Sequence, residues 1–451
     1  MTVDLDRIQQ RATALKLRSF AAPHMRTFHL TWLAFFVAFF GWFGVAPLMP
    51  LIRDDLGLSK AEVFNTIIAS VAITIVARIA IGWVLDRVGP RRTYTALLIA
   101  GSIPVMLVGL SQNYETFLLF RLAIGVIGAS FVITQYHTSV MFAPNVVGTA
   151  NATSAGWGNL GGGVTQLVMP LVLSAILLVG VSETLGWRLA MVVPGAVLFV
   201  MGFVYHRFTQ DAPEGDFKQL RAQGRLGAKA TRGSFLHAAR DPRVWALFLV
   251  YGACFGIELT VNNVAALYFH DRFELSLVLA GAIASLFGLM NIFARTLGGF
   301  FGDRCGIRWG LRGRVWFLGA VLLVEGLALI LFSRMGVIYL AIPTLILFSL
   351  FVQMSEGATF SVVPFVNKKA LGAVAGIVGA GGNAGAVAAG FLFRAEGIEA
   401  QDAFLYIGVV VAVIAPIALL VRFSARAETT ERRRLTEILG APAGGGGGGA
   451  G

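Results

Sequence analysis

Two arginines lie inside long apolar segments, where a charged side chain is costly. Arg78 and Arg295 each stand eight residues before an aspartate, Asp86 and Asp303 respectively. A helix rises about 1.5 Å per residue, which places each arginine about 12 Å from its aspartate and near the middle of a hydrocarbon core about 30 Å thick. A cation at that depth needs a partner. Guanidinium is planar, permanently charged and carries a rigid fork of donors, so two such groups are suited to a small planar anion.

The alternative partner for each arginine is a buried carboxylate. Three acids, Glu258, Glu325 and Glu356, lie clearly within apolar segments. An intramembrane carboxylate can neutralise an arginine or carry a proton. Both roles stay open for these acids at this stage.

The elements that position these groups follow from composition. Of the 451 residues 57% are apolar and only 13% are charged, whereas about 25% is typical of soluble domains. This balance excludes an ordinary soluble enzyme, a disordered chain and a disulfide-rich secreted scaffold. It predicts an all-α membrane protein, because a spanning helix needs about 20 apolar residues. Twelve segments qualify: 30–50, 62–85, 93–111, 116–140, 146–175, 188–206, 244–268, 276–302, 314–333, 337–363, 370–393 and 402–422.

The chain also repeats itself at long range. The pattern G-x3-D-R-x-G-x-R occurs at 82–91 and again 217 positions later, at 299–308. Arg78 and Arg295 have the same separation. This predicts two pseudo-symmetric six-helix halves, as in parallel-repeat transporters. The charged residues of the repeated loops are candidate gate residues that bridge helix ends, or else solvated topology anchors; they are Asp86, Arg87, Asp303 and Arg304.

Two glycine-rich stretches, 156–163 and 379–386, each contain one asparagine, Asn159 and Asn383. Glycines four residues apart predict close helix packing, and we expect these helices to slide against the opposite half. The G-x-G-x-x-G at 156–161 is not interpreted as a dinucleotide site, because no strand precedes it. An amide in lipid is costly unless it is paired. The asparagines are therefore predicted either to bridge helices or to contact a substrate.

Loop charge predicts the topology. The termini and loops on one side hold 27 of the 36 lysines and arginines, so that side is predicted to be cytoplasmic. The predicted organisation is a cytoplasmic segment 1–29, a six-helix half 30–206, a cytoplasmic linker 207–243, a second half 244–423 and a flexible tail 424–451. The net charge of +12 is attributed to this topology and not to nucleic-acid binding.

The motifs together resemble a known family. The two G-x3-D-R-x-G-x-R loops, with Arg121 and Gly125, resemble the major facilitator superfamily. Residues 28–50, FHLTWLAFFVAFFGWFGVAPLMP, resemble helix 1 of its nitrate/nitrite porter family. GWGNLGGG at 156–163 and GAGGNAGA at 379–386 resemble the two nitrate signatures of that family. The match extends from about residue 28 to residue 423.

The resemblance implies a substrate and a site. It implies a major facilitator fold and a secondary transporter that imports nitrate by alternating access. The family's two nitrate-binding arginines fall on Arg78 and Arg295, and the resemblance places Asn159 and Asn383 near the substrate. The ring positions that it implies line the site are Phe131, Tyr251 and Phe255.

The coupling mode is predicted from the segments around two acids. Residues 255–263, with Glu258, and 355–364, with Glu356, resemble the proton-coupled nitrate importers of plants and algae. Import of an anion against a negative-inside potential costs about 2.3 kcal/mol per 100 mV. We therefore expect proton symport with Glu258 and Glu356 as coupling residues; the alternative is nitrate/nitrite antiport.

Other classes of function are less consistent with the sequence. A membrane-embedded enzyme would need a nucleophile, metal cluster or cofactor motif near the membrane, and the sequence shows none. An anion channel would not need duplicated gate motifs. We expect no metal and no cofactor, and a monomer in the plasma (cytoplasmic) membrane with both termini cytoplasmic. Its partners are predicted to be nitrate, nitrite, possible protons and the lipid bilayer.

Overall fold

Helices make up nearly all of the computed structural model, which describes residues 10–225, 233–275, 277–368 and 370–440. No strand longer than an isolated bridge occurs within these residues. The helices of the N-terminal half are α1 (Pro23–Phe43), η2 (Ala46–Leu48), α2 (Met49–Leu56), α3 (Lys60–Val88), α4 (Pro90–Leu107), η3 (Val108–Leu110), α5 (Tyr114–Gly125), η4 (Val126–Ala129), α6 (Ser130–Met141), α7 (Val147–Leu178), α8 (Glu183–Ala190) and α9 (Val192–Phe208).

The C-terminal half has the matching order of elements. Its helices are α12 (Pro242–Phe273), α13 (Leu277–Leu289), η5 (Met290–Ile292), α14 (Ala294–Ser333), α15 (Ile338–Val366), α16 (Leu371–Arg394), α17 (Ala400–Ile414) and η6 (Ala415–Leu420).

The prediction of twelve spans is confirmed. Within the described residues, eleven apolar helical runs are long enough to cross a membrane, and one of them, Leu279–Ser333, contains two of the predicted spans. The backbone leaves helical geometry at Gly310, where φ is 72° and ψ is −162°. Glycine tolerates this conformation because it lacks a Cβ. The chain therefore reverses there, and α14 comprises two spanning helices.

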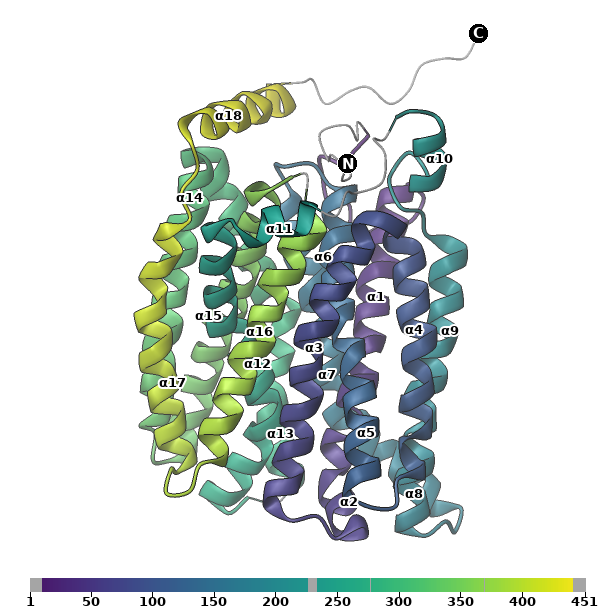
Figure 1. Ribbon diagram of the computed structural model, residues 1–451. Coiled ribbons are helices and arrows are strands. Elements are labelled where there is room, and N and C mark those ends of the chain that lie inside the picture. The colour runs from purple at the N-terminus through teal and green to yellow at the C-terminus, as the bar shows by residue number, and fades with distance from the viewer. Residues whose placement is uncertain (1–9, 226–232, 276, 369, 441–451) are drawn as a thin grey trace.

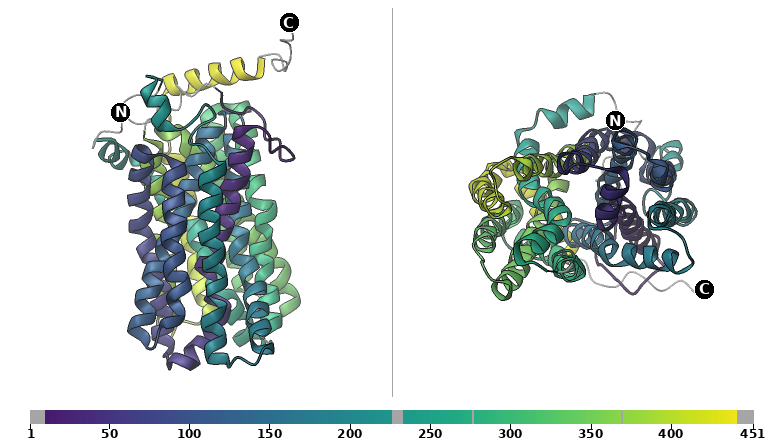
Figure 2. Two further views of the ribbon diagram at one scale, coloured as in Figure 1. Left: turned by 90° about the vertical axis from the view of Figure 1, so that its right-hand side faces the viewer. Right: turned by 90° about the horizontal axis from the view of Figure 1, so that it is seen from below.

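The two halves pack side by side. In Figure 1 the purple and blue helices of the N-terminal half occupy one side of the bundle, and the green and yellow helices of the C-terminal half occupy the other. The view from below in Figure 2 shows the same division. Helix α3 packs against α16, and α7 packs against α14 and α15. These contacts between halves bring both predicted arginines to the centre of the molecule.

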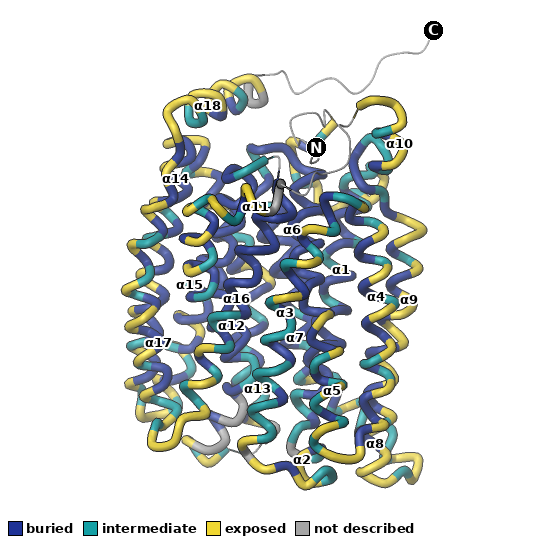
Figure 3. Tube along the Cα trace, in the orientation of Figure 1, coloured by how far each residue is buried: buried dark blue, intermediate teal, exposed yellow. Residues whose placement is uncertain are grey.

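Burial follows the distribution expected for a bundle in lipid. Exposed residues lie along the outer flanks of the bundle, whereas the helices at the boundary between halves are buried (Figure 3). Large apolar side chains such as Leu171, Phe203 and Val413 are exposed on the outside. Charged side chains such as Arg78 and Glu356 are buried inside. A lipid environment explains the apolar exterior.

Three further helices lie at one end of the bundle: α10 (Phe217–Ala222), α11 (Gly233–Ala239) and α18 (Ala425–Gly440) (Figure 1). Where the sequence predicts a flexible tail from residue 424, the structure has helix α18. Glu428 of α18 accepts hydrogen bonds from the backbone amides of Leu311 and Arg312, both at 3.0 Å. Glu431 forms a 2.9 Å ion pair with Lys368. Residues 441–451, the glycine-rich part of that tail, lie outside the described residues.

The linker after the first half is attached in a similar way. Asp211 accepts hydrogen bonds from the backbone amides of Arg91 (2.9 Å) and Phe217 (3.0 Å). Burial raises the pKa of Asp211 to about 6. Arg91 is the second residue of α4, as Arg312 is the second residue after Gly310. In each half, therefore, a carboxylate from the segment that follows the bundle caps the helix after the repeated loop.

Candidate functional site

Arg78 of α3 lies buried at the boundary between the halves, and no carboxylate pairs with it among the residues that the structure describes. Its Nε donates a hydrogen bond to the carbonyl of Gly128 (3.1 Å), and its Nη1 donates to the carbonyl of Gly379 in the opposite half (2.6 Å). Its guanidinium carbon lies 4.9 Å from the ring centroids of both Phe131 and Phe255. Backbone carbonyls and ring faces thus orient this cation while its full charge remains uncompensated.

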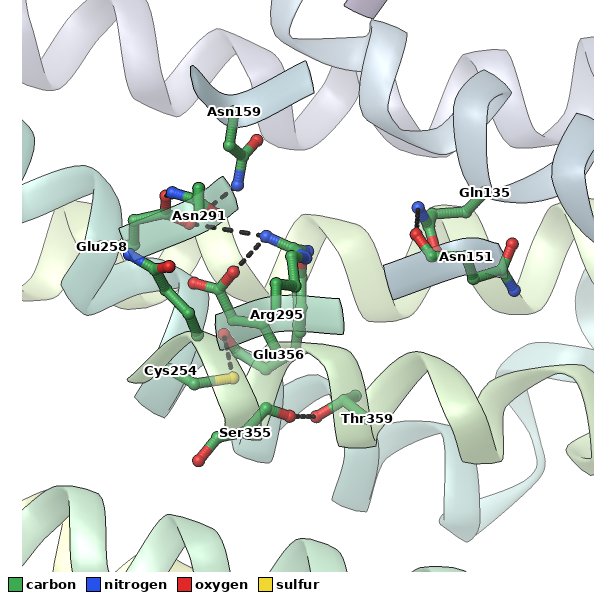
Figure 4. A network of polar contacts seen from close by, with 12 residues as sticks. Gln135, Asn151, Asn159, Cys254, Glu258, Asn291, Arg295, Ser355, Glu356 and Thr359 are labelled. Carbon is green, nitrogen blue, oxygen red and sulfur yellow. Dashed lines mark hydrogen bonds and ion pairs between the residues drawn. The ribbon is translucent and has the colours of Figure 1, made fainter. Parts of the chain in front are cut away.

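Arg295 of α14 is buried beside the same rings, its guanidinium carbon 5.5 Å from the centroid of Phe131 and 5.8 Å from that of Phe255, and acids surround it. Its Nη1 forms an ion pair with Glu356 of α15 and lies 3.5 Å from Oε2 of Glu258 on α12. Its Nη2 donates to the hydroxyl of Tyr251 at 2.9 Å. Figure 4 shows Arg295 pointing toward both glutamates. The carboxylate partner that the sequence left as an alternative is therefore present for Arg295 and absent for Arg78 among the described residues.

Four aromatic rings separate the two arginines from the surrounding helices. The rings of Tyr251 and Phe255, one helical turn apart on α12, stack at 5.1 Å with an angle of 9°. Phe131 of α6 stacks on both of them, at 5.5 and 5.4 Å. Phe360 of α15 meets Phe131 edge-on at 5.0 Å. The three rings predicted from the sequence therefore form one cluster, with Phe360 as a fourth member.

The two predicted asparagines differ in their partners. The side-chain amide of Asn159 on α7 donates to Oε2 of Glu258 at 2.9 Å, and Asn291 of η5 donates to Oε1 at 2.7 Å (Figure 4). Asn383 of α16 instead donates to the backbone carbonyl of Val71 on α3 at 3.1 Å. Each asparagine thus links one half to the other. Asn159 does so through the acid beside Arg295.

Asn291 and Phe360 belong to this cluster but were missed by the sequence analysis. Asn291 lies four residues before Arg295, and Phe360 lies four residues after Glu356. Residues four apart share a helix face. This spacing is the signal that could have found both residues.

The site has unused hydrogen-bond donors. Nη2 of Arg78 and Nε of Arg295 are buried, and neither has a partner among the described residues. With both arginines and both Glu258 and Glu356 ionised, the four side-chain charges cancel. Protonation of one glutamate would leave an excess of one positive charge. The arrangement can therefore bind a small anion through N–H donors when a proton is also bound.

The aspartates of the repeated loops cross between the halves. Asp86 of α3 accepts hydrogen bonds from the amides of Gly372 and Ala373 at the start of α16. Asp303 of α14 accepts from the amide and the hydroxyl of Thr149 at the start of α7, at 2.6 and 2.7 Å. A helix N-terminus favours a carboxylate through its free amides and its dipole. Both aspartates therefore link the two halves at this end of the molecule.

The arginines that follow these aspartates do not cross between the halves. Arg87 lies over the ring of Trp83 at 3.4 Å, and Arg304 lies over Phe300 at 4.9 Å, in each case four residues earlier on the same helix. The sequence analysis expected all four charged residues to bridge helix ends, but only the two aspartates do so. The backbone amides at the helix ends are hydrogen-bond donors. A carboxylate can accept from them, whereas an arginine, which is itself only a donor, cannot.

Glycines allow close approach of helix backbones at the end of the bundle where Asp86 and Asp303 cross between the halves. A Cβ atom on Gly82 of α3 would overlap the backbone of Gly372 on α16, and one on Gly299 of α14 would overlap the backbone of Gly148 on α7. The glycine pairs that we expected to slide against the opposite half have different neighbours. Gly158 packs on Phe35 of α1, and Gly381 packs on Phe248 of α12, each within its own half.

An apolar cavity lies toward the other end of the bundle. It is small, with a volume of about 20 Å³, and is lined by α3 of the first half and by α12 and α16 of the second. Phe64, Val71 and Phe393 are among its walls. Thr260 of α12 also lines it.

Comparisons with known proteins agree with this architecture. The family described as Major Facilitator Superfamily matches residues 31–390. "High-affinity nitrate transporter 2.3" of Oryza sativa subsp. japonica is 39% identical over 93% of this chain and 81% of its own length. "High affinity nitrate transporter 2.5" of Arabidopsis thaliana is 40% identical over 85% and 77%. "Nitrate/nitrite transporter NrtP" of Picosynechococcus is 31% identical over 80% and 83%.

Solved structures share the fold at low sequence identity. The human organic anion transporter MFSD10 (TETRAN) superposes with a TM-score of 0.60 at 17% identity, covering 88% of this chain and 99% of that one. A bacterial homologue of the human lysosomal transporter Spinster, in an inward-facing and unoccupied conformation, gives 0.62 at 16% identity over 91% and 99%. At these identities the similarity supports the twelve-helix arrangement alone.

Proposed function

Since the chain belongs to the nitrate/nitrite porter family of the major facilitator superfamily, we propose that it carries nitrate, and nitrite, across the plasma membrane by alternating access. The loop charges put both termini on the cytoplasmic side. The gate aspartates then lie at the cytoplasmic end, and the apolar cavity opens toward the outside. We propose that the protein works as a monomer, because one chain provides both halves of the site.

The observation that carries this proposal is the pair of arginines, one from each half, that contact the same ring cluster. Arg78 keeps a free Nη2 and Arg295 a free Nε. Nitrate is planar, has three acceptor oxygens and carries one negative charge, so two guanidinium forks can bind it in its own plane. The faces of Phe131 and Phe255 confine the same space. Asn159 and Asn383 each link the two halves beside the site: Asn159 donates to Glu258, and Asn383 donates to the backbone of α3.

The charge balance of the site favours proton symport. Nitrate must compete with Glu356 for the guanidinium of Arg295. When Glu356 takes a proton it loses its negative charge, and Arg295 becomes available to nitrate. One proton per nitrate makes the complex electrically neutral. Two protons give it a net positive charge, so that a negative-inside potential assists import by about 2.3 kcal/mol per 100 mV. We therefore propose symport with at least two protons, one of them on the pair Glu258 and Glu356.

Alternating access follows from the contacts between halves. Asp86 and Asp303 hold the cytoplasmic end closed by capping helices of the opposite half. Release of nitrate to the cytoplasm requires both caps to separate. The asparagine and arginine contacts between halves lie between these caps and the outer cavity, so a rocking of the halves about the site opens one end as it closes the other.

The direct test is uptake by the purified protein in proteoliposomes that contain no nitrite. We expect nitrate to accumulate when the outside is acidic and to stop accumulating when a protonophore is added. Chloride should not be accumulated. A strict requirement for internal nitrite would overturn symport in favour of antiport, and lack of flux for both anions would overturn the transport assignment.

Replacement of Glu356 by glutamine is expected to reduce proton coupling. The amide mimics the protonated acid permanently, so Arg295 remains available to nitrate while one proton site is lost. With a gradient of about one pH unit, nitrate accumulation should fall by about tenfold, because one pH unit corresponds to about 1.36 kcal/mol per proton. Nitrate exchange at equal pH should continue. The exposed Glu115→Gln serves as the control, and equal accumulation in both variants would exclude Glu356 from coupling.

A further inference from the structure

One buried acid takes no part in the contacts described above. Glu325 lies in the second spanning part of α14 and is fully buried. Neither of its carboxyl oxygens receives a hydrogen bond from a donor among the described residues. No ion pair is formed by Glu325 within the described chain either. An ionised carboxylate in such a place would cost several kcal/mol, so the burial of this acid favours its neutral form.

The neighbours of Glu325 come from three helices. Its helix packs against α15, which carries Ser355 and Glu356, and Cys254 of α12 lies within electrostatic range of it. On α17 the backbone of Gly408 and Ala412 packs against the adjacent Gly326. Figure 4 shows Cys254 and Ser355 beside Glu356. Arg295, the cation of the site, forms its ion pair with Glu356.

The hydroxyl of Ser355 on the neighbouring helix does not donate to Glu325. Ser355 donates its hydrogen to the backbone carbonyl of Phe351 at 2.8 Å. Both oxygens of Glu325 therefore remain without a hydrogen-bond partner among the described residues.

Buried acids are distributed unequally between the halves. Away from the gate, the fully buried acids of the described spans are Glu258, Glu325 and Glu356, and all three lie in the C-terminal half. The N-terminal half contributes Arg78 to the site, with no carboxylate beside it. The first half therefore supplies positive charge for the anion, and the second half supplies groups that can exchange protons.

We propose that Glu325 is the second proton site of the transporter, an inference that rests on the proton symport proposed above. Glu325 and Glu356 lie on helices that pack against each other. When nitrate takes Arg295 and Glu356 binds a proton, both acids are neutral, and two protons accompany one nitrate. Each proton is bound by a carboxylate oxygen and is released from the same oxygen on the side where nitrate leaves.

The test is the proton-to-nitrate ratio of Glu325→Gln in proteoliposomes. Glutamine has the shape and neutrality of the protonated acid, so a merely structural role tolerates it, whereas a proton site is lost. The ratio should fall from two to one. With an inside-negative potential of about 100 mV, the equilibrium accumulation ratio should then fall by about 50-fold, the effect of one transported charge. Nitrate exchange at equal pH reports that the variant is folded.

Glu325→Asp keeps the carboxyl group and should retain a ratio near two. Infrared spectra without nitrate should show a protonated carboxyl band that shifts in Glu325→Asp and disappears in Glu325→Gln. A ratio of two in Glu325→Gln, or an unchanged infrared band in both variants, would overturn the inference. A wild-type protein that only exchanges anions would instead overturn the proposed symport.

Discussion

Nitrate uptake is expected to fall by at least about 30-fold when Arg78 is replaced by lysine, because the loss of a buried, charge-assisted contact costs about 2–5 kcal/mol. Lysine keeps the positive charge but has a single ammonium group. It cannot hold the carbonyls of Gly128 and Gly379 and still present a planar pair of donors to an anion. Its small head also loses the flat contact with the faces of Phe131 and Phe255.

The measurement is initial nitrate uptake at several nitrate concentrations, with the amount of folded protein checked by gel filtration. The matched control is Arg207→Lys, because Arg207 is exposed at the end of α9 and forms no ion pair within the described residues. The control should transport normally. Uptake by Arg78→Lys within about threefold of wild type would exclude the bidentate binding mode, since the energy of a forked contact exceeds that difference.

The sequence predicted the helices and the repeated residues well for a physical reason. Membrane spans are long apolar runs, and an arginine within one of them stands out at any position. The duplication then placed Arg78 and Arg295 at equivalent depths. The structure brings these two arginines, both predicted asparagines and all three predicted rings to the boundary between the halves. Whether they bind nitrate is what the Arg78 variant tests.

The partners of these residues were not predictable in the same way. The duplication implies equivalent roles, yet Arg295 pairs with Glu356 while no acid pairs with Arg78 among the described residues. Glu258 and Glu356 belong to the same half as Arg295, so the asymmetry depends on which side chains of the neighbouring helices face each arginine, and a single sequence does not specify that. Helix α18 was missed because its charged residues read as a solvated tail. Its contacts come from Glu428 and Glu431, which meet donors more than 60 residues away in the chain.

The Gly82→Leu variant is expected to trap the transporter with its cytoplasmic end open. A side chain at position 82 would overlap the backbone of Gly372 and Gly376 on α16, and backbone atoms of a packed helix cannot move aside as the tip of a side chain can. Overpacking of this kind costs about 3 kcal/mol, which lowers the population of the closed state, and with it uptake, by about 100-fold. The site itself is unchanged, so nitrate binding should persist.

Spin labels at exposed positions 92 and 308, one on each half, report this shift as a longer distance between the labels in Gly82→Leu than in wild type. The matched control is Gly281→Leu in α13, where a Cβ atom meets open space and no shift is expected. Loss of uptake without a change in distance would show that Gly82 acts on something other than closure. A longer distance together with normal uptake would show that close contact of α3 and α16 is not required in the cycle.

Because the same contact recurs between Gly299 and Gly148, the result for Gly82 also predicts the behaviour of Gly299→Leu on the other side of the pseudo-symmetric boundary.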